Sequence, residues 1–180
     1  MKLVFLLEER SMKELLDLLL PRLLPSGIPF QTIPHSGKTD LQKSIKRKIN
    51  AWTEPDVAFI ILHDQDSNDC MVLKEKLTKL CVDSGKPFLV RIPCRELEAW
   101  YWGDLKAVSN AYGTDLTKLK NKKAYRDPDK IGNPKQELKK YIPTMGQIDG
   151  ARKIAPLMDI ENNTSHSFQV FVNGVLALCE

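Results

Sequence analysis

The chain has 180 residues, of which 42% are hydrophobic and 28% charged, and its formal net charge is +4. These values are ordinary for a globular protein. No apolar run reaches the roughly 20 residues that a membrane helix requires, and no internal repeat or low-complexity tract is present. Composition therefore argues against a membrane-spanning or fibrous chain and favours one globular domain with a helical elaboration.

The apolar stretch from Lys2 to Leu7 superficially resembles a signal peptide. Glu8 and Glu9 follow too soon and no small-residue cleavage site is present, so we interpret the stretch as a first strand. The four cysteines show no Cys-x-x-Cys spacing, which favours reduced structural thiols. Together these features predict a cytoplasmic protein.

The first half of the chain alternates strand and helix patterns. Strands are expected at residues 2–7, 30–34, 57–62 and 87–93, and residues 57–62 are apolar throughout, as in a strand buried on both faces. Between them, helices are expected from a capping box at Ser11 and Glu14 to a kink or end at Pro21, from Gly37 to about Trp52, and from a cap at Ser67 or Asn68 to about Gly85. This order predicts an α/β fold with a four-stranded parallel sheet flanked by helices.

The composition changes after Tyr112. A helix at residues 95–102 and a shorter one to Tyr112 are followed by a Lys-rich stretch without strand patterns, with helices expected at 135–141, at 148–158 and from a cap at Ser165 or Ser167 to Leu178. We therefore divide the chain into an α/β core, residues 1–113, and a basic, mainly helical extension, residues 114–180, packed on the same domain.

Acidic residues follow several of the predicted strands. Glu8 comes directly after the first strand, Asp64 and Asp66 follow the third, and Glu96 and Glu98 follow the fourth. The carboxyl ends of parallel strands meet at one edge of a sheet, where α/β proteins bind ligands. Clustered carboxylates repel one another unless a cation neutralises them or some are protonated, and oxygen ligands suit Mg²⁺ or Mn²⁺.

Some of these candidates have simpler explanations. Glu96 and Glu98 point to nearly opposite sides of a helix, and we favour Glu98 because an unpaired acid in its apolar surroundings would be costly. His63 and the earlier His35 lack a His or Cys partner at metal spacing, which argues against zinc. Trp100 to Trp102 either stack on nucleic-acid bases or, more commonly, pack in a core.

Positive charge is concentrated in two segments. Residues 118–140 contain nine Lys or Arg residues against three acids, and a second group lies between Lys38 and Lys48. Basic clusters beside an acidic pocket suit a polyanion held by its phosphates, although for either cluster alone we favour a solvated surface. The candidate phosphate-binding residues are Lys38, Lys122, Lys123 and Lys135.

The strand that ends in Glu and the later strand that ends in Asp-x-Asp resemble the Toprim domain of topoisomerases, bacterial primases and overcoming-lysogenization-defect nucleases. Most of the chain looks similar to a bacterial family of small Toprim-like proteins. The similarity rests on five stretches, which are Leu6–Ser11, Pro34–Lys38, His63–Cys70, Arg95–Trp100 and Gly132–Lys135.

The resemblance implies that Glu8 is a general acid/base, that Asp64 and Asp66 are metal ligands and that Glu96 or Glu98 completes the pocket. It implies a Mg²⁺- or Mn²⁺-dependent nuclease acting on DNA or RNA in a defence or DNA-processing system, with an ABC- or AAA-type ATPase as partner and homo-oligomeric assembly left open. One departure is visible, because Glu9 replaces the usual Gly and Met12 stands where a second acid is expected.

Two other functions fit the same residues. A non-catalytic module that keeps the fold and docks on an ATPase would not need the carboxylates for chemistry. A phosphohydrolase for small substrates would use Asp64 as a nucleophile, because Asp-x-Asp at a strand end also occurs in aspartyl-phosphate chemistry.

Overall fold

The fold was analysed in a computed structural model that describes every residue from Met1 to Glu180. The four predicted strands form one parallel sheet in the order β2-β1-β3-β4, comprising β1 (Lys2–Leu7), β2 (Phe30–Pro34), β3 (Val57–Leu62) and β4 (Phe88–Arg91). The predicted fold class is thus confirmed. The central strands β1 and β3 are almost wholly buried because apolar side chains cover both of their faces.

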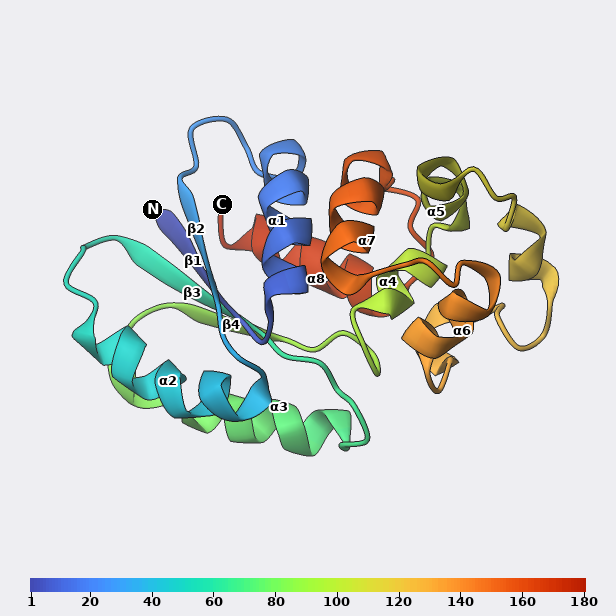
Figure 1. Ribbon diagram of the computed structural model, residues 1–180. Helices are drawn as coiled ribbons and strands as arrows, with labels where there is room; N and C mark the ends of the chain where they lie inside the picture. The colour runs from blue at the N-terminus through green and yellow to red at the C-terminus, as the bar shows by residue number, and fades with distance from the viewer.

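Helices cover both faces of the sheet (Figure 1). One face packs against α2 (Lys38–Ala51) and α3 (Cys70–Lys79), with Val4, Leu6 and Phe59 of the strands in a core of 13 buried residues. The other face packs against α1 (Arg10–Leu23) and the C-terminal helices, in a core of 33 buried residues. The alternation of side chains along β1 divides its residues between the two cores.

The remaining helices follow β4 and lie beside the sheet and beyond its carboxyl edge (Figure 1). They are α4 (Glu98–Trp102), α5 (Leu105–Tyr112), α6 (Pro134–Tyr141), α7 (Gln147–Ile154) and α8 (His166–Ala177). Short 3₁₀ helices lie at Val82–Ser84, before β4, and at Thr117–Asn121, Pro128–Lys130 and Ala155–Leu157. None of the helices combines the length and the apolar character that a bilayer span requires.

Several helix ends differ from the prediction. The capping box is wrong, because α1 begins at Arg10, the Ser11 hydroxyl donates to the Glu9 carboxylate, and Glu14 pairs with Arg10 and Arg152. Pro21 does not end α1, which continues to Leu23.

Of the caps predicted for two other helices, one is wrong and one is confirmed. The cap of α3 is Asp69, whose carboxylate accepts from the backbone N–H groups of Met71 and Val72, in place of Ser67 or Asn68. At the last helix Ser165, one of the two predicted residues, is the cap and accepts from the Phe168 N–H.

Candidate functional site at the carboxyl edge of the sheet

The pairing of β1 with β3 places Glu8 beside His63. Leu7 is in register with Leu62, so the next residue of each strand emerges at the same edge, and the Glu8 N–H donates to the Leu62 carbonyl at 3.2 Å. The Glu8 carboxylate then accepts from the backbone N–H of Asp64 at 2.9 Å, and its Oε2 lies 3.1 Å from His63 Nδ1. Residues 8 and 64 therefore meet, as the strand pattern predicts.

Burial and mutual repulsion shift the protonation of these acids. Burial, followed by the charge of Asp66, raises the pKa of Glu8 to about 7, although the Asp64 N–H opposes the shift. The pKa of Asp64 is raised well above its usual range by burial and by the charges of Glu8 and Glu98. Oδ1 of Asp64 is buried without a hydrogen-bond partner. The site thus contains buried carboxyl groups whose negative charges are not balanced by positive side chains within it.

Glu98, the first residue of α4, lies next to Asp64 at the same edge of the sheet. Its side chain is buried with the residue only 4% exposed, and burial, with the charge of Glu96 behind it, raises its pKa to about 7. Glu96 is half-buried and accepts from the backbone N–H of Lys135 at 3.1 Å. Of the two acids after β4, Glu98 is the one whose charge reaches Asp64.

Asp66 lies at the rim of the site. Its carboxylate pairs with Lys38 Nζ at 2.9 Å, and its side chain is one-third exposed. Its backbone is left-handed, with φ 52°, and so is that of Arg95, with φ 63°. The Asp66 N–H donates to the Arg95 carbonyl at 2.7 Å and Arg95 Nη1 donates to the Asp66 carbonyl at 3.1 Å. The loops after β3 and β4 are therefore tied together in a strained conformation, as is common at functional sites.

The predicted phosphate-binding lysines do not all gather here. Lys38 borders a hollow of about 300 Å³ between α2 and α3, and Lys135 is the second residue of α6 and lies beside Glu96. Lys122 instead lies near the ring of Tyr141, at the other end of α6, and Lys123 is exposed next to it in sequence. Lys135 and Tyr141 are six positions apart in the helix, which corresponds to about 9 Å along the axis.

His63 is a member of the site that the sequence interpretation missed. The Lys76 ammonium donates to Gln42 Oε1 at 2.7 Å, which turns the Gln42 amide nitrogen towards His63 Nε2 at 2.9 Å. His63 Nε2 is then the acceptor, and Nδ1 carries the proton that faces the Asp64 carbonyl at 2.6 Å and Glu8. Burial lowers the pKa of His63, which agrees with a neutral ring. Its position next to Leu62, in register with Leu7, was the available signal.

The aromatic run beside Glu98 does not contact solvent. Trp100 and Trp102 are at most 2% exposed and pack on Phe168, Phe171 and Tyr125, so the base-stacking interpretation is wrong and the core interpretation is confirmed. Tyr101 is also buried, and its hydroxyl has no partner. Burial, and then the charge of Glu98, raises the pKa of that hydroxyl well above its usual range.

The donor set at this edge fits a hard divalent cation. Asp64 has a buried carboxylate oxygen without a partner, and the acids around it are shifted in the direction that an added positive charge would reverse. No three His, Cys, Asp or Glu side chains stand close enough to hold one ion as they are placed. Mg²⁺ characteristically binds through one or two carboxylates and retains several waters or substrate phosphates.

Comparison with known proteins identifies the family of the chain. No curated protein and no solved structure is significantly similar to the chain. A family model described as a domain of unknown function (DUF4276) matches residues 7–176, a range that includes all of the acidic residues discussed above. The chain therefore belongs to the DUF4276 family.

Proposed function

We propose that the protein is a Mg²⁺- or Mn²⁺-dependent nuclease that hydrolyses phosphodiester bonds in DNA or RNA. The observation that carries the proposal is the meeting of Glu8 with Asp64 and His63 at the carboxyl edge of the sheet, with a buried Asp64 oxygen left unpaired. Such edges bind ligands in α/β proteins, and strongly shifted acids cluster at functional sites.

Glu8 has the properties of a general acid/base. A pKa of about 7 lets it exist in both protonation states near neutral pH, where such a group transfers protons most effectively. The Asp64 N–H donates to Oε2 of Glu8, and His63 Nδ1, whose proton is shared with the Asp64 carbonyl, lies 3.1 Å from the same oxygen. These contacts on one side of the carboxylate leave Oε1 for a water molecule or a leaving group. Glu8 would therefore accept a proton from the attacking water.

Asp64 is the residue best placed to hold the cation, with Asp66 at the rim and Glu98 behind. When bound, Mg²⁺ or Mn²⁺ stabilises negative charge on phosphate oxygens. Lys38 and Lys135 flank the acids and would contact the phosphates on either side. The partner ATPase and the role in defence or DNA processing remain part of this proposal through the Toprim resemblance.

The proposal predicts that Glu8→Gln and Asp64→Asn abolish cleavage. We expect each variant to lose at least about 100-fold of the rate, the usual contribution of a general acid/base, on supercoiled DNA, single-stranded DNA or RNA with Mg²⁺ or Mn²⁺. Glu75→Gln is the matched control, because Glu75 is an exposed acid of α3 paired only with Lys79. A wild-type protein that cuts none of these substrates, alone or with the ATPase encoded beside it, would contradict the proposal.

One observation favours a second function. Met12 stands at the position of the second acid in Toprim nucleases. It is fully buried in the core, so this position supplies no carboxylate to the site. A non-catalytic module that docks on an ATPase accommodates this loss. It predicts that Glu8→Gln and Asp64→Asn leave the cellular function intact, whereas the nuclease requires both residues.

A further inference from the structure

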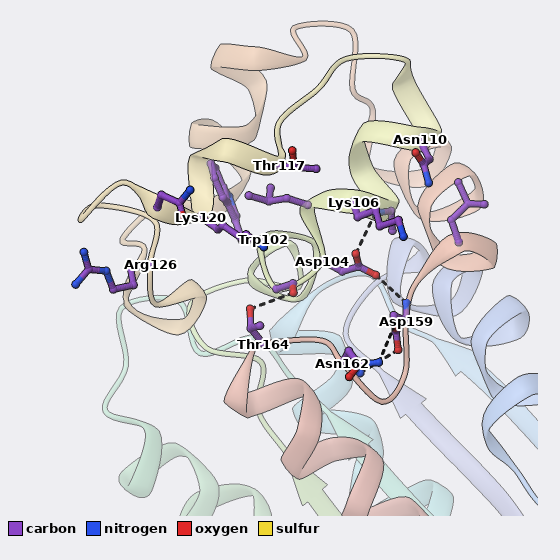
Figure 2. Close-up of a pocket in the computed structure, with 15 residues that line it drawn as sticks. Trp102, Asp104, Lys106, Asn110, Thr117, Lys120, Arg126, Asp159, Asn162 and Thr164 are labelled. Carbon is purple, nitrogen blue, oxygen red and sulfur yellow. Dashed lines mark hydrogen bonds between the residues drawn. The ribbon is translucent and has the colours of Figure 1, made fainter.

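A second hollow lies away from the acidic edge, at the other end of α4. It has a volume of about 670 Å³ and is formed by the α4–α5 turn, the segment 117–126 and the loop before α8. Figure 2 shows three positively charged side chains around it, Lys106 on α5, Lys120 on the 3₁₀ helix and Arg126 in the following turn. The hollow has the size of a small-molecule site.

The three cations have no acidic partner. Lys106, Lys120 and Arg126 are exposed, and none of them forms an ion pair, although eleven ion pairs occur elsewhere in the protein. Like charges around a concave surface repel one another and focus a positive potential into the hollow. An anion is the ligand that would relieve this repulsion.

Two acids, Asp104 and Asp159, also line the hollow, so that its formal net charge is +1 (three cations against two carboxylates). Both carboxylates are bound to backbone N–H groups. The Asp104 carboxylate accepts from the N–H groups of Ala107 at 3.0 Å and Asp159 at 2.7 Å. Asp159 accepts from the N–H groups of Glu161 and Asn162 and from the Asn162 amide. These acids hold the walls together, as the dashed lines in Figure 2 show, and neither forms an ion pair with a cation of the hollow. The pKa of Asp159 is lowered by its hydrogen bonds to Asn162 and Glu161 and then by the charge of Lys106.

The walls are fixed independently of any ligand. The Gly103 carbonyl accepts from the N–H and the hydroxyl of Thr164 at 2.9 and 3.1 Å, which seats the loop before α8 against the α4–α5 turn. On the other side, the ring of Tyr125 stacks on Trp102 with the ring centroids 4.4 Å apart, next to Arg126. Binding to a preformed hollow avoids the cost of ordering its walls.

The neutral lining suits a phosphorylated ligand with a less polar part. Asn110, Asn162 and Thr117 offer amide and hydroxyl groups, and Leu157, which is 45% exposed, adds an apolar surface. We infer that this hollow binds a phosphate-bearing ligand of nucleotide size through Lys106, Lys120 and Arg126. The phosphate comes either from a free nucleotide or from the backbone of a nucleic-acid strand, and the inference does not depend on the proposed nuclease activity.

The test measures binding of three probes in EDTA, so that hydrolysis plays no part. The probes are pyrophosphate, ATP and a fluorescein-labelled 12-nucleotide single strand, titrated by calorimetry or by fluorescence anisotropy. The test variant is Lys106→Gln/Lys120→Gln/Arg126→Gln. The control is Lys74→Gln/Lys79→Gln/Lys153→Gln, which removes three exposed cations that lie outside both basic segments; Lys79 and Lys153 form only exposed i,i+4 ion pairs, which contribute little to stability.

We expect at least one probe to bind the wild type, and the test variant to weaken that binding about tenfold or more while the control changes it less than about twofold. Binding of pyrophosphate and ATP identifies a free nucleotide as the source, and binding of the strand alone identifies nucleic acid. Failure of all three probes to bind, or an equal loss in both variants, overturns the inference. Circular dichroism of each variant checks that the fold is kept, which the exposure of the six side chains predicts.

Discussion

Glu98 illustrates how a single buried acid couples this fold to pH. Its pKa is raised from 4.5 to about 7, first by burial and then by the charge of Glu96. An acid with a raised pKa in the folded protein binds its proton more tightly there than in the unfolded chain. Its contribution therefore favours folding below pH 4.5 and is lost as the pH rises through about 7.

The variant Glu98→Gln should remove this dependence. Compared with the wild type, we expect its free energy of unfolding to rise by about 3 kcal/mol between pH 4 and pH 8, because one pKa unit corresponds to about 1.4 kcal/mol. Urea denaturation in EDTA at several pH values measures the difference, and any constant cost of burying the amide cancels. Glu75→Gln should show no such slope. A difference between Glu98→Gln and the wild type that stays flat with pH would refute the assigned shift.

The residues of the site were predictable to different degrees. Glu8 and Asp64 were found because each follows a strongly apolar strand, and register in a parallel sheet then brings them together. The position of His63 directly after β3 was a signal that it reaches the same edge, but its bond to Gln42 on α2 was not predictable, because no spacing along the chain predicts a contact between a strand end and a helix. Lys122 and Lys123 were assigned to a phosphate site from local charge alone, whereas the structure gathers Lys120 and Arg126 from the same segment around a different hollow.

At the scale of elements, strands were predicted better than caps. β2 spans Phe30–Pro34 and β3 spans Val57–Leu62, as the sequence predicts, because prolines mark the limits of β2 and polar residues delimit the apolar run of β3. α4 is shorter than the predicted 95–102 and begins at Glu98. The left-handed backbone of Arg95 and its bonds to the loop after β3 replace the expected first turn, and these contacts depend on tertiary structure.

The junction between α4 and α8 depends on the absence of one side chain. A Cβ atom at Gly103 would lie 2.0 Å from the Asn163 Oδ1 and 2.7 Å from the backbone nitrogen of Ser165, the cap of α8. The Asn163 amide also donates to the Trp100 carbonyl at 2.9 Å, so the loop cannot move away without losing this bond. Close approach to a backbone is a position where only glycine fits.

Gly103→Ala should therefore destabilise the protein. We expect a loss of about 1–3 kcal/mol in the free energy of unfolding, the usual cost of overpacking, measured by urea denaturation. Gly132→Ala is the matched control, because a Cβ atom there meets no atom within 4 Å and the backbone is not left-handed. Its effect should stay within about 0.5 kcal/mol. Equal effects of the two substitutions would show that the junction has room for a methyl group.

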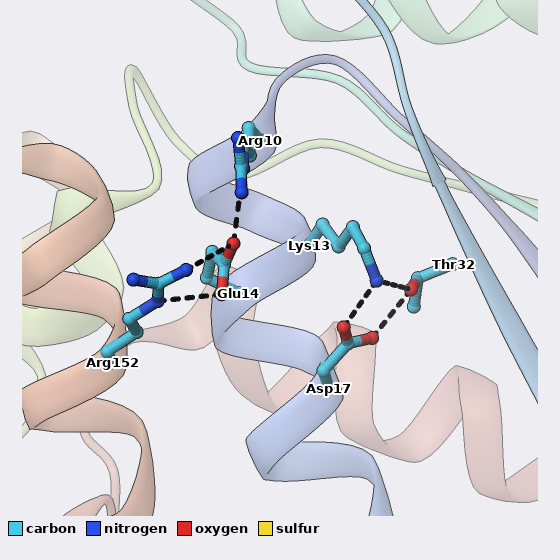
Figure 3. Close-up of polar contacts among 6 residues, drawn as sticks. All are labelled: Arg10, Lys13, Glu14, Asp17, Thr32 and Arg152. Atoms are coloured by element: carbon cyan, nitrogen blue, oxygen red, sulfur yellow. Dashed lines mark hydrogen bonds and ion pairs between the residues drawn. The ribbon is translucent and has the colours of Figure 1, made fainter.

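At the scale of the whole molecule, the C-terminal part completes the main core. Of the 33 residues in that core, 14 lie beyond residue 113, and they pack with β1, β3 and α1. Polar contacts fasten the same surfaces, since Arg152 of α7 donates two hydrogen bonds to Glu14 of α1, which also accepts from Arg10 (Figure 3). On the other side of α1, Lys13 and Asp17 bind Thr32 of β2 (Figure 3).

A fragment of residues 1–113 should consequently not fold alone. Without the later residues, the apolar faces of α1, α4 and α5 would be exposed to water, at a cost of roughly 25 cal/mol for each Å². We expect no cooperative transition in urea denaturation of the fragment, followed by circular dichroism, under conditions where the full chain unfolds cooperatively. Cooperative unfolding of the fragment would mean that the core at residues 1–113 is an independent domain.

The position of β2 at the outside of the sheet also affects how the protein behaves at high concentration. An open strand edge offers unpaired N–H and C=O groups to another chain and is a common start of aggregation. β2 has only five residues, ends at Pro34 and is preceded by Pro29. Proline has no N–H to donate, so both ends of this edge are unsuited to receiving another strand. The two prolines that delimit β2 thus disfavour aggregation of the protein through this edge.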